Sequence, residues 1–228
     1  MAVSRLAGIE ACVFDAYGTL FDVHAAAARC RDALGDDADK LSTLWRDKQL
    51  QYTWLRSLMQ RHADFWRVTG DALDYALAAI GRNDPALRER LMDIYRVLDA
   101  FPEVPRMLER LRDAGMKTAI LSNGAPEMLT AAVDNAGIGG LLDAILSVEA
   151  IGTYKPDPAV YRLASDNLGV APGAVCFLSS NAWDVCGAAT FGFTVVWINR
   201  NGQPPERLPG GPVVELSDLT GLPDLLGA

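Results

Sequence analysis

The side chains of this sequence that could do chemistry together follow short apolar runs. They are Asp15 after the run 11–14, Ser122 and Asn123 after 118–121, Ser179, Ser180 and Asn181 after 174–178, and Lys155 in the loop after 144–147. A carboxylate can act as a nucleophile, a nearby lysine favours its ionised form, and hydroxyl and amide groups can hold an anion. The residue types suit nucleophilic catalysis by a carboxylate, provided that the fold brings them together.

The apolar runs have the length and composition of buried strands. They cover 11–14, 118–121, 144–147, 174–178 and 193–198, and a last short strand is expected near 213–216, after the Pro/Gly-rich loop 201–212. Segments with helical spacing lie between most of them, over 104–115, 126–137 and 158–169. This alternation predicts a doubly wound, Rossmann-like parallel α/β sheet with helices on both faces. Ligands bind such sheets outside the carboxyl ends of the strands, where the polar residues would gather.

Residues 22–99 interrupt the alternation. They contain no convincing strand and at least three stretches with helical spacing, around 23–34, 40–62 and 71–98. The segment "AFPEVP", with its two prolines, would return the chain to the sheet. We therefore predict an α/β core domain made of 1–21 and 100–228, with an all-helical cap domain, 22–99, inserted after the first strand.

The composition excludes several functions. Half of the 228 residues are hydrophobic and 22% are charged, which is typical of a folded globular protein. The formal net charge is −8 with a pI near 4.8, and no basic stripe could neutralise phosphates, so we expect no nucleic-acid partner. A small anionic substrate would need a local cluster of positive charge to overcome this negative field.

The cysteine pattern and the amino-terminal segment favour a cytoplasmic location. The four cysteines, Cys12, Cys30, Cys176 and Cys186, lack Cys-x-x-Cys spacing. Cys12 and Cys176 lie within apolar runs, as buried free thiols do, and with only His24 and His62 the cysteines offer no metal site. The amino-terminal apolar stretch is too short and interrupted for a signal peptide. No run approaches the roughly 18 apolar residues of a membrane span.

Four motifs then suggest a family. "FDAYGTL", "LSNG", "YKPDPAVY" and "FLSSNAWD" occur in an order and spacing that resemble the haloacid dehalogenase superfamily, across the whole chain. The stretch "LWRDKQLQYTWLRSLM", 44–59, is similar to a cap segment of its (S)-2-haloacid dehalogenases, the type II haloalkanoic acid dehalogenases. The resemblance implies hydrolysis of short (S)-2-haloacids to (R)-2-hydroxy acids and halide through an ester on Asp15. It also implies a homodimer.

The resemblance implies a catalytic role for several candidates, namely Asp15, Thr19, Arg46, Lys155, Ser179, Asn181 and Asp184. Asp15 is the expected nucleophile, which Thr19 orients and Lys155 keeps ionised. Arg46, from the cap, would meet the departing halide. Asp184, with Ser179 and Asn181 nearby, is the candidate for activating water in the second step.

The expected substrate-binding residues are Tyr17, Leu50, Phe65, Ser122, Asn123, Tyr161 and Trp183. Ser122, Asn123 and backbone amides near Tyr17 would hold the substrate carboxylate or the halide. The resemblance implies that Leu50, Phe65 and Trp183 line an apolar pocket for the alkyl group. Tyr161 matches a tyrosine of the family in the helix after Lys155.

The main alternative is a magnesium-dependent phosphatase or phosphonatase of the same superfamily. Those enzymes read Asp-x-Asp where this chain has Asp15-Ala16-Tyr17, because the second Asp protonates a poor leaving group. A halide ion needs no general acid, so its absence costs a dehalogenase little. Ser180 likewise replaces an acid of the family's magnesium loop, and two carboxylates would hold magnesium weakly. We therefore expect no metal and no cofactor.

Plainer interpretations compete for single residues. Asp15 could cap a turn, Thr19 could cap a helix and Lys155 could be a solvated loop charge. The stretch around Arg46 has the composition of an exposed helix face, and Phe65 at helical spacing could be cap core. Asp184 could hold Lys155 or Ser179 in place instead of activating water. A binding protein that kept the fold without catalysis is a third function, which the joint presence of Asp15, Lys155 and Arg46 disfavours.

Overall fold

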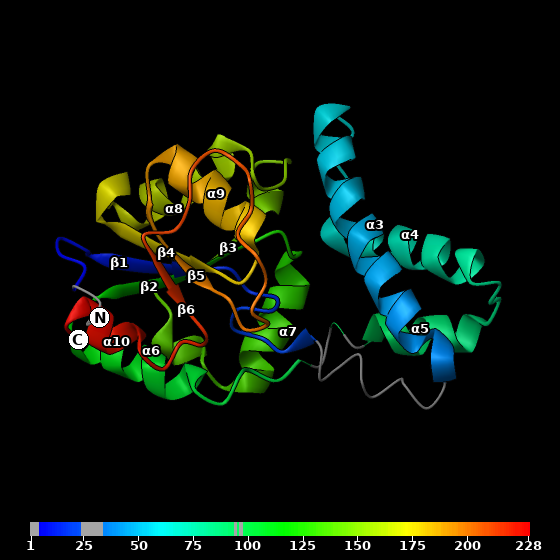
Figure 1. The fold of residues 1–228 in the computed structure, drawn as a ribbon, viewed down its shortest axis with the longest axis horizontal. Coiled ribbons are helices and arrows are strands. Elements are labelled where there is room, and N and C mark those ends of the chain that lie inside the picture. Colours follow the sequence, from blue (N-terminus) through cyan, green and yellow to red (C-terminus); the bar gives the residue numbers. More distant parts are fainter. Residues whose placement is uncertain (1–4, 24–33, 94, 96–97) are drawn as a thin grey trace.

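The computed structural model of the chain describes residues 5–23, 34–93, 95 and 98–228. Its core is one six-stranded parallel sheet in the order β3-β2-β1-β4-β5-β6 (Figure 1). The strands are β1 (Ala11–Phe14), β2 (Lys117–Ser122), β3 (Ala144–Ser147), β4 (Val175–Ser179), β5 (Thr194–Ile198) and β6 (Val214–Leu216). The strand order runs outward in both directions from β1 and β4, which makes their boundary the switch point where such sheets bind ligands. The predicted fold class and all six predicted strands are confirmed.

Helices cover both faces of the sheet because its central strands are apolar on both sides. All four residues of β1 and all five of β4 are buried. Helices α8 (Pro158–Leu168) and α9 (Ala182–Phe191) lie on one face, and α6 (Val104–Asp113), α7 (Pro126–Ala136) and α10 (Leu222–Leu226) on the other (Figure 1). Short 3₁₀ turns are η1 (Gly35–Asp37), η3 (Gly139–Leu141), η4 (Val148–Ala150) and η5 (Pro172–Ala174). As the sequence predicts, α7 and α8 begin at prolines and end at Gly137 and Gly169.

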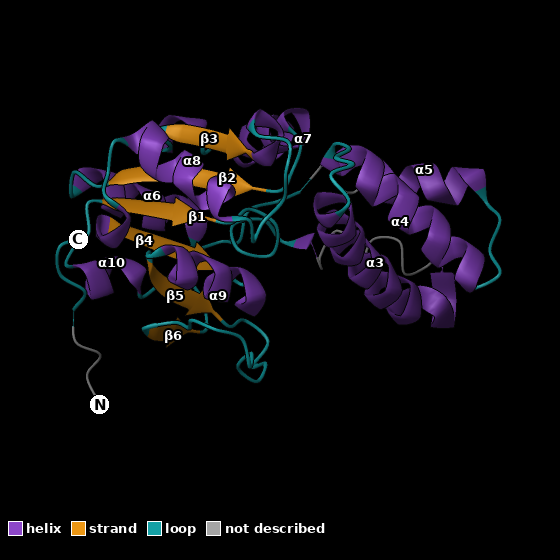
Figure 2. Cartoon of the chain, turned by 90° about the horizontal axis from the view of Figure 1, so that it is seen from above, coloured by secondary structure: helices purple, strands orange, loops and turns teal. Residues whose placement is uncertain are grey.

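Three further helices lie together beyond the carboxyl ends of the strands (Figure 2). They are α3 (Ala38–Leu58), α4 (Phe65–Ala79) and α5 (Pro85–Asp93). The chain leaves and rejoins the sheet side by side, because Asp22 N–H donates to the Asp99 carbonyl at 2.9 Å and Phe21 bridges Ala100. This arrangement fits an inserted helical cap; the exact domain limits of 22–99 stay a prediction.

The helix limits within this segment differ from those that the sequence suggests. The stretch 71–98 is not one helix: α4 begins earlier, at Phe65, where the Asp64 side chain accepts a hydrogen bond from Arg67 N–H. Helix α4 ends just before Gly81, which has a φ of +72°. Helix α5 then begins after Asp84, whose side chain accepts hydrogen bonds from the N–H groups of Ala86 and Leu87. Most of the stretch 23–34, with His24 and Cys30, lies outside the described residues.

The cysteines and the helices bear on the two expectations of buried free thiols and of no membrane span. Cys12, Cys176 and Cys186 are free and buried, as predicted for the first two. Among the helices that the structure describes, none combines the length and apolar character that crossing a membrane requires.

A close approach between α9 and the loop after β3 depends on Gly187. A Cβ at this position would lie 2.5 Å from the Tyr161 hydroxyl oxygen and 2.7 Å from Pro156 Cβ. Both distances are far below van der Waals contact, so the helix packs this closely only because Gly187 has no side chain. Gly187 therefore sets the distance between α9, α8 and the loop that carries Lys155.

We predict that Gly187→Ala lowers the free energy of unfolding by about 1–3 kcal/mol, because the added methyl overpacks a buried contact. Alanine normally stabilises a helix interior relative to glycine by about 1 kcal/mol. A loss of stability would therefore indicate the steric contact, and a gain would indicate helix propensity alone. The measurement is urea unfolding followed by circular dichroism. Gly173→Ala is the matched control, because its Cβ would meet nothing within 4 Å. An unchanged or higher midpoint for Gly187→Ala would contradict this account of the packing.

Candidate active site

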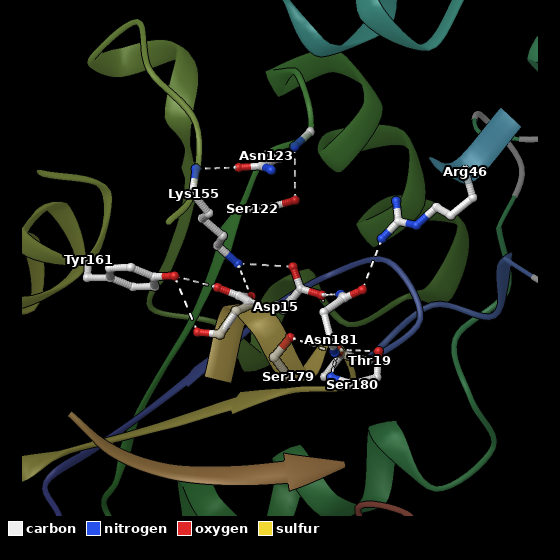
Figure 3. Close-up of polar contacts among 12 residues, drawn as sticks. Asp15, Thr19, Arg46, Ser122, Asn123, Lys155, Tyr161, Ser179, Ser180 and Asn181 are labelled. Atoms are coloured by element: carbon white, nitrogen blue, oxygen red, sulfur yellow. Dashed lines mark hydrogen bonds and ion pairs between the residues drawn. The ribbon is translucent and has the colours of Figure 1, made fainter. Parts of the chain in front are cut away.

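A buried lysine joins two carboxylates at the switch point of the sheet (Figure 3). Lys155 Nζ lies 3.0 Å from Asp15 Oδ1 and 2.8 Å from Asp184 Oδ2. Asp15 follows β1, Lys155 lies in the loop after β3, and Asp184 belongs to the first turn of α9. The exposed fractions of Asp15, Lys155 and Asp184 are 7%, 1% and 0%, so water screens these charges little. The sequence-based expectation that these residues come together at one edge is met by the geometry.

Burial and the opposite charge act in opposite directions on the pKa values of Lys155 and Asp184. Burial alone would lower the pKa of Lys155, but the adjacent Asp15 and Asp184 outweigh it and leave this pKa raised. Burial raises the pKa of Asp184, and Lys155 opposes that shift. Burial, followed by the charge of Asp184, also raises the pKa of Tyr161, whose hydroxyl stays protonated and donates to Asp184 Oδ1 at 2.8 Å. Lysine and tyrosine thus occupy both oxygens of Asp184, which supports the alternative in which Asp184 holds Lys155.

The other oxygen of Asp15 accepts from two further donors. Thr19 Oγ1 lies 3.2 Å and Asn181 Nδ2 3.0 Å from Asp15 Oδ2. The Thr19 hydroxyl itself accepts from the backbone N–H of Ser180 at 2.8 Å, which leaves its proton for Asp15 or for the Ser180 hydroxyl. Together with Lys155, these donors fix the plane of the Asp15 carboxylate and leave it at the edge of a small cavity.

That cavity brings most of the candidate residues together. It is lined by Asp15, Tyr17, Arg46, Leu50, Phe65, Ser122, Asn123, Lys155, Asn181 and Trp183, each of which the sequence nominates. The Tyr17 ring stacks on Phe65 at 6.1 Å between ring centroids and meets Tyr95 edge-on at 5.9 Å. The cavity therefore has one charged side, at Asp15, Lys155 and Arg46, and one largely apolar side.

Two polar atoms of this lining have no hydrogen-bond partner. The Tyr17 hydroxyl and the Trp183 indole nitrogen are both buried and unpaired. The Tyr17 ring is also held in place, because a Cβ at Gly124 would lie only 2.7 Å from it. An unpaired buried donor costs stability, so these atoms are suited to meeting an acceptor on a bound ligand.

Four candidates lie behind the cavity wall. Besides Thr19 and Asp184, Ser179 is fully buried and its Oγ accepts from the Asn181 N–H at 3.1 Å. The expectation that Tyr161 contacts substrate is corrected here: its side chain is fully buried, its hydroxyl donates to Asp184, and its ring packs against Phe177. The apolar spacing along α8 predicts that Tyr161 lies on the side of the helix that faces the core. The hydrogen bond from its hydroxyl to Asp184 cannot be predicted from the sequence.

The two residues after β2 are also partly engaged by the backbone. Ser122 Oγ accepts from Gly124 N–H at 3.0 Å, and Asn123 Oδ1 accepts from Lys155 N–H at 3.1 Å. Each keeps further capacity, a hydroxyl proton on Ser122 and the amide protons on Asn123. Both can therefore still donate to an anion in the cavity.

Gln49, which is not among the residues predicted from the sequence, holds Arg46. Arg46 Nη1 donates to Gln49 Oε1 at 2.7 Å, and Arg46 Nη2 donates to Asn181 Oδ1 at 3.1 Å. The orientation of the Gln49 amide is fixed, because its Nε2 donates at 2.8 Å to Thr69 Oγ1, whose own proton goes to the Phe65 carbonyl. Gln49 is fully buried. Its only sequence signal is its position three residues after Arg46, on the same side of the helix.

The residues present do not fit a magnesium ion. The ammonium of Lys155 already lies against both carboxylates, and the Ser180 hydroxyl, at the place of the missing acid, lies 3.2 Å from Thr19 Oγ1. Within the described part of the chain, no group of three or more His, Cys, Asp or Glu side chains is arranged to hold a metal.

The fold and the site together define an α/β protein with a buried carboxylate, Asp15, at the end of the first strand and in contact with a lysine. A sequence profile described as haloacid dehalogenase-like hydrolase matches residues 9–192. The chain belongs to the haloacid dehalogenase-like hydrolases.

Similar proteins include two curated relatives. The chain is 51% identical to (S)-2-haloacid dehalogenase 4A of Burkholderia cepacia over 87% of this chain and 86% of that one. It is 49% identical to (S)-2-haloacid dehalogenase 1 of Pseudomonas sp. (strain CBS-3), over 96% of each. The solved structure of an L-2-haloacid dehalogenase from Xanthobacter autotrophicus with chloropropionic acid covalently bound superposes on this chain with a TM-score of 0.89. That structure is 39% identical, and the match covers 96% of this chain and 99% of that chain.

We predict that Lys155→Met is less stable than the parent by about 3–5 kcal/mol near neutral pH, because it leaves two buried carboxylates without their cation. The folded state raises the pKa of Lys155 above its ordinary 10.5. The stabilisation by its charge is therefore complete below about pH 10.5 and is lost as the pH rises through the higher folded value. The gap in unfolding free energy between parent and Lys155→Met should narrow above that pH in urea titrations. Lys40→Met, at an exposed position, is the control, and a gap that widens with pH would contradict the assignment.

We predict that Gln49→Leu lowers turnover by about tenfold or more, because the Arg46 guanidinium loses the acceptor that fixes it. The effect should fall on kcat more than on KM, and Gln49→Glu, which keeps an acceptor for Arg46, should retain more activity than Gln49→Leu. Gln51→Leu, two residues on and exposed, is the matched control. Equal losses in the two Gln49 variants would indicate a packing role alone.

Proposed function

We propose that this chain hydrolyses short (S)-2-haloalkanoic acids to (R)-2-hydroxyalkanoic acids and halide. The observation that carries the proposal is the geometry of Asp15: its carboxylate borders a small cavity that Arg46 and Lys155 also line. Nucleophile and substrate are both anions, so the two cations are required locally in a chain with a net charge of −8. Relatives at 49–51% identity bear the name (S)-2-haloacid dehalogenase.

In the first step an Asp15 oxygen attacks the Cα of the substrate from the side opposite the halogen. A C–O bond forms, the carbon–halogen bond breaks, and the halide leaves with the bonding pair, so the configuration at Cα inverts and Asp15 carries an ester. Arg46 stabilises the departing halide. Ser122 and Asn123 donate to the substrate carboxylate, and the apolar side at Leu50, Phe65 and Trp183 holds the alkyl group and excludes water.

In the second step water attacks the carbonyl carbon of the Asp15 ester. The acyl C–O bond breaks, the 2-hydroxy acid leaves, and the Asp15 carboxylate is restored with one oxygen from water. Esterification removes the charge of Asp15, which leaves Asp184 as the remaining carboxylate beside Lys155. Asp184, whose two oxygens accept from Lys155 and Tyr161, holds Lys155 beside the ester. Of the two protons of the attacking water, one passes to the leaving alkoxide of the 2-hydroxy acid and the other is released as the Asp15 carboxylate forms.

No specific observation favours the phosphatase alternative. At the place of that enzyme's leaving-group acid the chain has Tyr17, whose pKa burial raises further, so that it stays protonated but is a poor acid. The neighbours of its ring are Phe65 and Tyr95, which form an apolar wall.

The assembly and the location are part of the proposal. A homodimer is supported by the exposed apolar residues at the end of α3, where Leu55, Leu58 and Met59 are 43%, 81% and 61% exposed at helical spacing. A cytoplasmic location is supported by the free, buried thiols of Cys12, Cys176 and Cys186.

The decisive test is a single turnover of (S)-2-chloropropionate in H₂¹⁸O with enzyme in excess. We expect the label in the Asp15 peptide and not in the lactate, because water attacks the enzyme carbonyl and not the substrate carbon. Mass spectrometry of peptide and product makes the measurement, and the (R) enantiomer should release no more halide than Asp15→Asn does. Labelled lactate with unlabelled Asp15 would show direct attack by water and overturn the covalent route.

A further inference from the structure

A second, larger cavity adjoins the substrate cavity. It measures about 1350 Å³ against about 290 Å³, both including space open to solvent. The two cavities share three lining residues, Tyr17, Arg46 and Asn181. Arg46 Nη2 and Asn181 Oδ1 are joined by the 3.1 Å hydrogen bond that also crosses from α3 to the loop after β4 (Figure 3). These three side chains therefore form the partition between the cavities.

The walls of the second cavity are largely apolar and aromatic, with a set of hydrogen-bond donors among them. Ser42 and Arg46 come from α3, and Asn199, Arg200 and Gln203 come from the loop after β5. Asp22 is the one carboxylate among the described lining residues. These donors suit a small anion, because amide, hydroxyl and guanidinium N–H and O–H groups can replace the hydrogen bonds that water makes to it.

Arg200 contributes a guanidinium held in a fixed position to this wall. Its Nη2 donates to Glu103 Oε1 at 2.7 Å and to the Thr19 carbonyl at 3.0 Å, and its guanidinium carbon lies 3.5 Å from the centre of the Phe101 ring. Its Nε is buried and has no hydrogen-bond partner. The guanidinium is thus fixed in place, with its Nε turned into the packed interior and not toward open space.

In a covalent mechanism the halide has to leave while the acid is still bound to Asp15. In the first step the halide forms while the acid remains tethered to Asp15 in the small cavity. The halide forms beside Arg46, which lines both cavities. Departure into the second cavity requires passage at the Arg46–Asn181 pair, whereas departure through the substrate cavity requires passage around the tethered acid.

We propose that the second cavity is the route by which the halide leaves the enzyme, moving from Arg46 past Asn181 toward Arg200 and solvent. The proposal rests on the dehalogenase function proposed above.

Ser42 offers a way to narrow the route without touching the reacting atoms. It is half-buried on α3, one helical turn before Arg46, and lines the second cavity alone. Ser42→Phe places a ring in that space. Thr43→Phe, at the adjacent exposed position of the same helix, is the matched control. Gln203→Trp narrows the cavity from the opposite wall, in an exposed loop where a folding defect has less reason to arise.

The experiment compares halide formed with halide released during the first turnover of (S)-2-bromopropionate. Acid-quenched samples report all bromide formed, and a fluorescent halide indicator in unquenched stopped-flow reports only bromide free in solution. In Ser42→Phe and Gln203→Trp we expect formation within about twofold of the parent and release slower by about tenfold, since release then limits turnover. Thr43→Phe should match the parent in both.

Two results would overturn the route. Release that keeps pace with formation in both narrowed variants would show that the halide leaves elsewhere. A fall in formation equal to the fall in release would show that the substitutions disturb Arg46 and not a passage. Absence of bromide formation in the parent chain would instead refute the proposed function, so the two failures are distinguishable.

Discussion

The contact of one buried ammonium with two buried carboxylates is the constraint on which this site depends. Burying any one of these charges alone would cost several kcal/mol, and removing one member leaves the others uncompensated. Lys155 therefore has to lie between Asp15 and Asp184, at 3.0 and 2.8 Å, for the sheet edge to fold as it does. The same contact places a cation beside the nucleophile. Stability and reactivity thus depend on a single geometry.

The fold supplies that geometry from three separated connections. Asp15 ends the central strand β1, Lys155 comes from the loop after β3, and Asp184 begins α9 after β4. Because β1 and β4 are neighbours at the switch point, Asp15 and the start of α9 lie side by side, and Lys155 reaches them from across β2. Tyr161 and Gly187 then fix the distance from α8 to α9. Packing behind the site is therefore as specific as the hydrogen bonds within it.

The sequence predicts the sheet better than the helices that cover its edge. Buried parallel strands are near-continuous apolar runs bounded by loops, and the rule that ligands meet the carboxyl ends then nominates residues such as Asp15, Asn123 and Asn181 without further information. The break at Gly81 has a sequence signal that the prediction of one helix over 71–98 passed over, because a glycine, an Asp84 N-cap and Pro85 mark a helix end and a new start. Tyr161 and Gln49 show a different limit. A buried hydroxyl or amide acts through its partner, and the identities of Asp184 and Arg46 as those partners are properties of the folded chain alone.

The charge balance explains why the cavity needs neutral donors as well. Asp15 and Asp184 are matched by Lys155 and Arg46, so the resting site is close to neutral. A bound haloacid adds one negative charge, and carbon–halogen cleavage transfers charge from Asp15 to the halide without changing the total. No further cation lines the small cavity among the described residues. The added charge must therefore be met by dipoles, from Ser122, Asn123 and the unpaired donors of Tyr17 and Trp183. A tyrosine two residues after the nucleophile then serves as a wall that can also donate, where a second carboxylate would repel both the substrate and the halide.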